Sequence, residues 1–144
     1  MKLETSFGVI PLRKHSGVWE VLLVQHLGGN HWGFPKGKAE DMETSRETAS
    51  RELLEETGLT IKRYLTDAEI KEHYDFIKGG EEIKKSVTYF IAEVQGKAVF
   101  QKEELFNLKW VPLFEAEAHL TFPEARNVCL QAISLFDSFD LTVN

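Results

Sequence analysis

Short runs of β-branched and other apolar residues recur along the chain, with turn signals between them. Two of these runs, residues 6–13 (SFGVIPLR) and 19–26 (WEVLLVQH), flank the turn signal HSGV. Runs of this length and composition, bounded by turn residues, predict two paired strands. Residues 59–66, 84–94 and 108–113 have the same character, so we expect further strands there.

The spacing of apolar residues becomes helical after residue 44. Thr44 and Glu47 form a T-x-x-E capping box, and Gly58 stands where a helix commonly ends on a left-handed residue. A helix is therefore predicted over about residues 45–57. Its small and apolar positions fall within one arc of about 140°, which we expect to be the buried face: Ala49, Ser50, Leu53, Leu54 and Thr57.

Residues 122–139 (FPEARNVCLQAISLFDSF) predict a closing helix, with Pro123 in its first turn. We find no internal repeat, low-complexity tract or linker in the sequence. Strands combined with two helices in a chain of 144 residues predict one α/β (or α+β) sandwich, a single domain that spans residues 1–144.

Composition narrows the function classes. The net charge of −6 and the pI of 5.4 argue against a surface made for wrapping nucleic acid. The single cysteine, Cys129, lies among apolar residues at helical spacing and is expected in the core rather than as a nucleophile. The first residues lack a signal-peptide pattern, and no run approaches the roughly 18 apolar residues of a membrane span. We therefore expect a cytoplasmic protein without a membrane partner.

Three glutamates crowd the end of the predicted helix. Glu52, Glu55 and Glu56 stand at i, i+3 and i+4, where like charges cost about 0.2–0.5 kcal/mol per pair and the helix dipole adds to the penalty. One interpretation is a solvated acidic face. The other is a site for Mg²⁺ or Mn²⁺, which prefer oxygen ligands and would reverse the repulsion.

The residues around the glutamates favour the metal site. Residues 37–59 (GKAEDMETSRETASRELLEETGL) match the pattern G-x5-E-x7-R-E-U-x-E-E-x-G-U at every specified position, where U is a bulky aliphatic residue. This pattern is the Nudix box, and the chain therefore resembles the Nudix hydrolases. The resemblance implies an α/β/α sandwich around a mixed central sheet, and hydrolysis of a nucleoside diphosphate linked to another moiety.

The resemblance also implies roles for residues of the box. Divalent metal would be bound by the carboxylates of Glu52, Glu55 and Glu56 together with the backbone carbonyl of Gly37. A further metal-binding or base glutamate of several Nudix enzymes matches Glu104, six residues before Trp110, with Glu103 as the alternative in a neighbouring register.

Two other residues of the box are implied to position the catalytic group. Arg51 resembles the family arginine that orients a catalytic glutamate, and Glu43 resembles its ionic partner. The alternative is an ordinary surface ion pair, worth less than about 1 kcal/mol. We select Glu52 as the general base, while a base outside the box stays open.

Segments outside the box indicate the substrate. HWGFPKGK (residues 31–38) and KKSVTYFIAEV (residues 84–94) resemble segments of the asymmetrical bis(5′-nucleosyl)-tetraphosphatases. The first would place Lys36 against phosphate, although a solvated loop lysine is the alternative, and His31 is kept as a substrate-side residue. The second implies contacts of Lys84, Lys85 and Tyr89 with polyphosphate and adenine.

Aromatic residues provide candidates for base stacking, which contributes about 1–3 kcal/mol per base. Among His73, Tyr74, Phe76 and Tyr89 we retain Tyr74 and Tyr89. Alternation along a strand places Tyr89 and Phe90 on opposite faces, so we expect one of these two to belong to the core.

These observations predict a Mg²⁺- or Mn²⁺-dependent hydrolase that splits diadenosine tetraphosphate into ATP and AMP by attack of water on a phosphorus. An RNA 5′-end pyrophosphohydrolase, or an enzyme for another nucleoside-diphosphate derivative, is the alternative. The net charge and the lack of a basic stretch weigh against an RNA partner. A non-catalytic nucleotide sensor would be expected to lack a glutamate of the box, and none is missing.

Overall fold

The computed structural model describes residues 1–27, 29–99 and 105–139. The elements in chain order are β1 (Lys2–His15), β2 (Val18–His26), β3 (Trp32–Gly33), β4 (Lys36–Lys38), α1 (Ser45–Thr57), β5 (Thr60–Lys78), β6 (Glu81–Gln95), β7 (Leu105–Pro112), the 3-10 helix η1 (Leu113–His119), α2 (Pro123–Leu135) and the 3-10 turn η2 (Phe136–Ser138).

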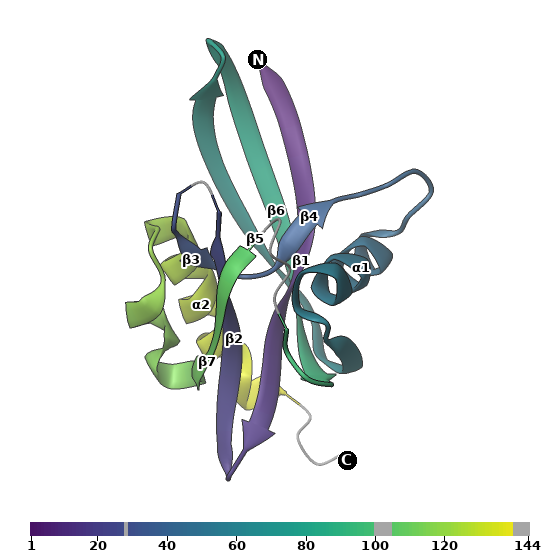
Figure 1. The fold of residues 1–144 in the computed structure, drawn as a ribbon, viewed down its shortest axis with the longest axis vertical. Coiled ribbons are helices and arrows are strands. Elements are labelled where there is room, and N and C mark those ends of the chain that lie inside the picture. Colours follow the sequence, from purple (N-terminus) through teal and green to yellow (C-terminus); the bar gives the residue numbers. More distant parts are fainter. Residues whose placement is uncertain (28, 100–104, 140–144) are drawn as a thin grey trace.

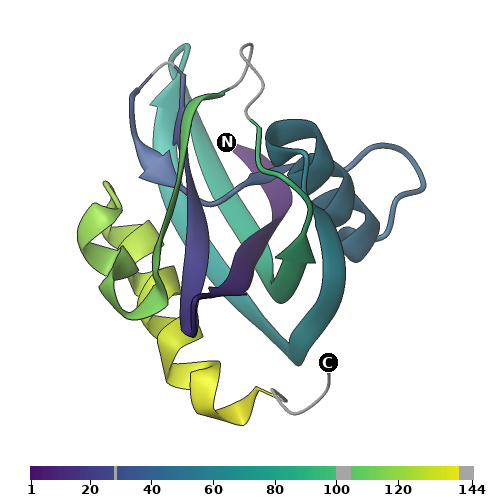
Figure 2. The ribbon, with the colours of Figure 1, turned by 60° about the horizontal axis from the view of Figure 1, so that its bottom comes forward.

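In the described part of the chain, seven strands form one mixed sheet. Its main path is β3-β2-β1-β6-β5, with β4 paired to β1 and β7 paired to β2. The pairing of β1 with β6 is parallel and the other pairings are antiparallel. Helices α1 and α2 lie on opposite sides of the sheet (Figures 1 and 2). The predicted sandwich around a mixed sheet is therefore confirmed.

Both faces of the sheet are buried, and this changes one expectation. Val87, Tyr89 and Ile91 of β6 join the core on the α2 side, whereas Phe90 and Ala92 join the core on the α1 side. We expected only one of Tyr89 and Phe90 in the core, and both are 2% exposed. The reason is that a helical layer covers each face of the sheet, so alternation leaves neither side chain in solvent.

Helix α1 begins and ends as predicted. The Thr44 hydroxyl accepts a hydrogen bond from the Glu47 amide (3.2 Å), and the Glu47 carboxylate accepts one from the Thr44 amide (2.8 Å). Gly58 ends the helix with a φ of 76°, in the left-handed region that glycine adopts without strain.

The buried face of α1 is rotated from the predicted arc. Leu54 is 50% exposed, so its assignment to the buried face is wrong. Glu56 is buried in its place. The physical reason is a polar contact: one Glu56 oxygen accepts a hydrogen bond from the backbone amide of Lys36 (3.1 Å).

Strand β5 is longer than the predicted strand over residues 59–66. It continues to Lys78 and pairs with β6 through most of its length, with register shifts between Ile61 and Arg63 and between Tyr64 and Glu69. This hairpin and the start of β1 extend beyond the helices (Figure 1). The part of β5 that was not predicted, residues 67–78, is rich in charged residues. These residues obscured the alternation of inward-facing and outward-facing side chains.

The last predicted helix is shorter than residues 122–139. It is α helical to Leu135 and ends in the 3-10 turn η2. Cys129 is buried in it, as expected. Within the described ranges, no helix has the length and apolar character needed to cross a membrane.

Candidate active site

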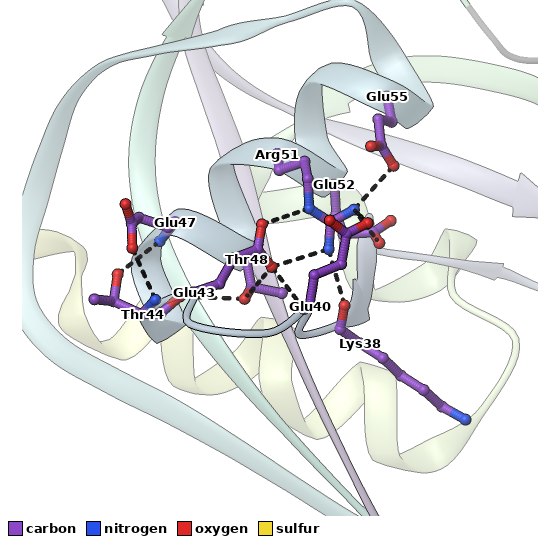
Figure 3. A network of polar contacts seen from close by, with 9 residues as sticks. All are labelled: Lys38, Glu40, Glu43, Thr44, Glu47, Thr48, Arg51, Glu52 and Glu55. Carbon is purple, nitrogen blue, oxygen red and sulfur yellow. Dashed lines mark hydrogen bonds and ion pairs between the residues drawn. The ribbon is translucent and has the colours of Figure 1, made fainter.

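Arg51 is the centre of a network of carboxylates on α1 and the loop before it (Figure 3). Its Nε and Nη2 donate to the two oxygens of Glu43, at 2.6 and 3.1 Å. Its Nη1 donates to Glu52 and to Glu55, both at 3.1 Å, and Nη2 also donates to the Lys38 carbonyl (2.9 Å). One guanidinium therefore fixes the loop and two glutamates of α1, because its planar fork offers several donors at once.

Glu43 is held more firmly than a single-contact surface pair. Besides Arg51, its carboxylate accepts hydrogen bonds from the Glu40 amide (2.8 Å) and the Thr48 hydroxyl (2.9 Å). The hydrogen bonds from Arg51, and then that from the Glu40 amide, lower the pKa of Glu43 to about 2. The same pairing with Glu43 raises the pKa of Arg51. Both groups are therefore charged at neutral pH.

Gly37 of β4 lies directly against Glu52. A Cβ at position 37 would overlap the Glu52 carboxylate, so this position requires the absence of a side chain. The preceding residue, Lys36, donates its amide to Glu56. The backbone of two successive residues thus approaches two glutamates of the box.

The donor chemistry of this helix end suits a hard divalent cation. Glu52, Glu55 and Glu56 provide only oxygen donors, which Mg²⁺ and Mn²⁺ prefer. Over the described ranges, no group of three acidic, histidine or cysteine side chains is already gathered around a possible metal position. Arg51 binds Glu52 and Glu55 in this arrangement. Glu104 and its alternative Glu103 lie outside the described residues.

A cavity of about 400 Å³ opens beside this helix end, between β5, β6, the β3–β4 segment and the start of α2. Of the predicted substrate residues, His31, Lys36, Tyr74 and Tyr89 line it. Phe76 does so as well. The remaining aromatic side chains of the wall are Trp32, Phe34 and Phe122, together with His26. The cavity therefore offers flat apolar faces of the kind that bind a nucleobase.

The two predicted lysines of β6 differ in placement. Lys85 has a side chain only 10% exposed, lies 3.8 Å from Glu4, and has a pKa lowered by burial and by the positive charge of Lys36. Lys84 has a side chain 46% exposed and contacts Asp75 at 3.4 Å. Successive side chains of a strand point to opposite faces, and Lys85 shares its face with Tyr74, its partner on β5. Neither lysine belongs to the wall of the cavity, and their roles in binding stay predictions.

His31 is part of a stack of rings at one side of the cavity. Its ring lies 4.8 Å from that of His26 and 5.1 Å from that of Phe122. Burial, and then the charge of Lys36, lower the pKa of His26 to about 3 and also lower that of His31. At neutral pH both rings are uncharged, so His31 offers a ring face and a polar nitrogen rather than a positive charge.

Glu72 also lines the cavity and was not among the site residues predicted from the sequence. Its side chain is buried, burial raises its pKa, and the Tyr89 hydroxyl donates a hydrogen bond to it that acts in the opposite direction. Ile70, Glu72, Tyr74 and Phe76 alternate along β5, and this period of two was the available signal.

The cavity and the glutamate cluster meet at β4. Lys36 lines the cavity, while its amide binds Glu56 and the next residue, Gly37, contacts Glu52. A nucleotide whose base enters the cavity can therefore extend its phosphates past Lys36 towards the carboxylates of α1.

The chain is similar to known proteins over most of its length. The NUDIX domain model matches residues 2–132. The chain is 30% identical over 128 residues to the asymmetrical bis(5′-nucleosyl)-tetraphosphatase of Mus musculus, covering 83% of the chain and 86% of that protein. It is 31% identical over 116 residues to the 8-oxo-(d)GTP phosphatase of Mycolicibacterium smegmatis, covering 79% of the chain and 34% of that protein.

The chain spans less than half the length of this mycobacterial protein and of a second mycobacterial relative. Among solved structures, the Ap4A hydrolase of C. elegans superposes with a TM-score of 0.70 at 27% identity, covering 93% of this chain and 98% of that chain.

Proposed function

Because this chain belongs to the Nudix family, we propose that it is a divalent-cation-dependent hydrolase that splits diadenosine tetraphosphate into ATP and AMP. The observation that carries this proposal is the junction at Lys36 and Gly37: Lys36 lines a cavity with aromatic walls, and the backbone of these two residues lies against Glu56 and Glu52 of the Nudix box. The similarity to the mouse tetraphosphatase, which covers most of both chains, supports the same substrate.

Glu52, Glu55 and Glu56, with the Gly37 carbonyl and Glu104, are the residues we propose to hold the cation. When bound there, Mg²⁺ (or Mn²⁺) supplies positive charge that offsets the charge of the polyphosphate and lowers the pKa of a bound water.

The protein residues account for binding and proton transfer. Lys36 and Lys85 provide positive charge on the cavity side, and Tyr74 and the neighbouring aromatic side chains hold the base by stacking. Glu52 accepts the proton of the water that attacks phosphorus, and the bridging P–O bond breaks to release ATP and AMP. Arg51, anchored on Glu43, keeps the Glu52 carboxylate in position.

A second candidate is hydrolysis of a modified nucleoside triphosphate. The similarity to the mycobacterial 8-oxo-(d)GTP phosphatase favours it, although that match covers about a third of that protein. The tetraphosphatase proposal has the advantage that both chains are matched almost end to end.

A substrate panel decides between these functions. Purified protein with Mg²⁺ is incubated with diadenosine tetraphosphate, nucleoside triphosphates including 8-oxo-dGTP, ADP-sugars and triphosphorylated RNA, and the products are separated by chromatography. We expect ATP and AMP from diadenosine tetraphosphate, at the highest kcat/KM of the panel. Two molecules of ADP as the only products, or faster turnover of another substrate, would reject the proposal.

A further inference from the structure

One carboxylic side chain is buried in the wall of the aromatic cavity. Glu72 is 7% exposed and lines the cavity from β5. The other acidic side chains of the wall differ: Asp75 is 61% exposed and pairs with Lys84, and Glu124 is only partly buried at the start of α2. A buried carboxyl group among aromatic rings costs free energy unless it is hydrogen-bonded, and the Tyr89 hydroxyl provides one such bond to Glu72.

The surroundings of Glu72 prepare it to accept a hydrogen bond. Burial raises the pKa of Glu72, whereas the positive charge of Lys36, the hydrogen bond donated by the Tyr89 hydroxyl and the charge of Lys85 favour its ionised form. An ionised carboxylate has about four acceptor positions, so the hydrogen bond from Tyr89 leaves acceptor capacity for a ligand.

The aromatic walls determine what kind of ligand brings the donor. Trp32 and Tyr74 line the same cavity as Glu72, and Tyr74 lies on the same strand as Glu72, two residues away. A planar base stacked on such a ring presents its edge, rather than its face, to the side chains beside the ring. Adenine carries an exocyclic amino group on that edge, which is a donor that a carboxylate accepts.

We propose that Glu72, positioned by Tyr89, accepts a hydrogen bond from the exocyclic amino group of an adenine in this cavity and so favours adenine over a purine that lacks this group. This inference rests on the proposed function, because it requires an adenine nucleotide as the substrate. Glu72 is here a specificity residue that contacts the base, whereas Tyr89 acts through Glu72.

The test compares two ligands that differ in the amino group alone. Calorimetry measures the dissociation constants of AMP and of purine riboside 5′-monophosphate, which lacks the amino group, for the wild type and its variants. We expect the wild type to bind AMP about tenfold more tightly, the effect of one hydrogen bond to a charged acceptor. Glu72→Ala should bind both ligands equally. Glu72→Gln should keep most of the preference through its amide oxygen, and it guards against misfolding of the alanine variant.

Asp75→Asn is the control, because it alters a nearby carboxylate of β5 that pairs with Lys84 on the face of the strand opposite Glu72, and it should keep the tenfold preference. A preference that persists in Glu72→Ala, or its absence from the wild type, would overturn the inference. Hydrolysis of diadenosine tetraphosphate in the same preparations separates the two proposals. Turnover of this substrate with no amino-group preference rejects the role of Glu72 alone, whereas no turnover rejects the proposed function.

Discussion

The Glu52 carboxylate occupies the space into which any side chain at Gly37 would project. A Cβ at position 37 would overlap the carboxyl carbon and both oxygens of Glu52. These atoms are the end of a flexible side chain, so Glu52 can rotate away at little cost to the fold. We therefore expect Gly37→Ala to melt within a few degrees of the wild type while kcat falls by about 10²-fold or more, because the displaced group is the proposed base.

Gly8→Ala provides the contrasting control. A Cβ at Gly8 would overlap the backbone carbonyl oxygen of Pro35, which cannot rotate away. This variant should lose stability, with a lower melting temperature, by the mechanism of overpacking, which typically costs about 1–3 kcal/mol. Equal loss of stability in Gly37→Ala and Gly8→Ala would show that the space at Gly37 serves packing rather than the placement of Glu52.

Replacement of Glu52 by glutamine tests the glutamate cluster itself. The variant loses one of three crowded negative charges, but it also loses part of a contact with Arg51, so its stability without metal should stay within about 1 kcal/mol of the wild type. Mg²⁺ should raise the melting temperature of the wild type more than that of the variant, because a ligand stabilises the state that binds it. We expect kcat to fall by about 10²–10⁴-fold.

Melting curves with and without Mg²⁺, measured beside kcat, test both effects. A Glu52→Gln variant that is unstable without metal yet turns over normally would identify Glu52 as a structural residue. The metal site would then have to be sought at Glu55, Glu56 and Glu104.

The third prediction concerns the planar guanidinium of Arg51 and its several hydrogen bonds. Arg51→Lys keeps the positive charge but cannot bind both Glu43 oxygens, Glu52 and the Lys38 carbonyl at once. We expect a loss of about 1–2 kcal/mol in the free energy of unfolding, measured in urea, and a fall in kcat of about tenfold or more.

The control for this substitution is Arg13→Lys on the hairpin of β1 and β2. Arg13 also pairs with a glutamate, Glu20, at 2.9 Å, but lies outside the network of the Nudix box. Its replacement should leave kcat unchanged. If the two variants have the same kcat, Arg51 does not position the base.

The features that could be predicted from the sequence are those that depend on residues close to one another along the chain. The caps of α1 and the spacing of Glu52, Glu55 and Glu56 depend on residues within a few turns of one helix, and the structure places the caps as expected. The rotation of α1 was not predictable, because Glu56 is buried by a hydrogen bond from a backbone amide twenty residues earlier in the chain.

The cavity was not predictable for the same reason, because its wall combines residues that are far apart in the sequence. Glu72 reaches it through the pairing of β5 with β6, and Phe122 reaches it from the segment before α2. Charged residues between 67 and 78 conceal a strand whose inward positions still alternate. A search for alternation that tolerates polar residues would have found Glu72, but the approach of Phe122 to His31 required the fold.

The fourth prediction concerns acid stability. The pKa of His26 is about 3 in the folded chain, against an ordinary value of 6.5, because burial disfavours its charged form. Between these two values the unfolded chain binds a proton that the folded chain does not, so His26 lowers stability as the pH falls. Glu72, whose pKa is raised, acts in the opposite direction, and therefore a comparison between variants is needed.

We expect the melting temperature of the wild type to fall more than that of His26→Gln between about pH 7.5 and pH 5. This range lies above most of the titration of Glu43, whose pKa is lowered. His15→Gln, at an exposed histidine, serves as the control and should follow the wild type. If the melting temperature of His26→Gln falls as much as that of the wild type, burial of the neutral His26 ring is not a source of acid sensitivity.

The last prediction uses two adjacent lysines as test and control. Lys85 is nearly buried on the face of the sheet that carries Tyr74, with Lys36 close enough to lower its pKa, and two such close positive charges suit a polyphosphate. Lys84 is exposed on the opposite face and paired with Asp75. Lys85→Ala should therefore lower kcat/KM for diadenosine tetraphosphate by about tenfold, the loss expected for one charge-assisted contact, while Lys84→Ala should stay within about twofold of the wild type.

Circular dichroism and melting curves establish that both variants fold. Removal of Lys85 relieves its repulsion with Lys36 but loses its contact with Glu4, so the two effects on stability oppose each other and the main effect should appear in catalysis. A Lys84→Ala variant that loses as much activity as Lys85→Ala would place the polyphosphate on the face of the sheet opposite Lys85.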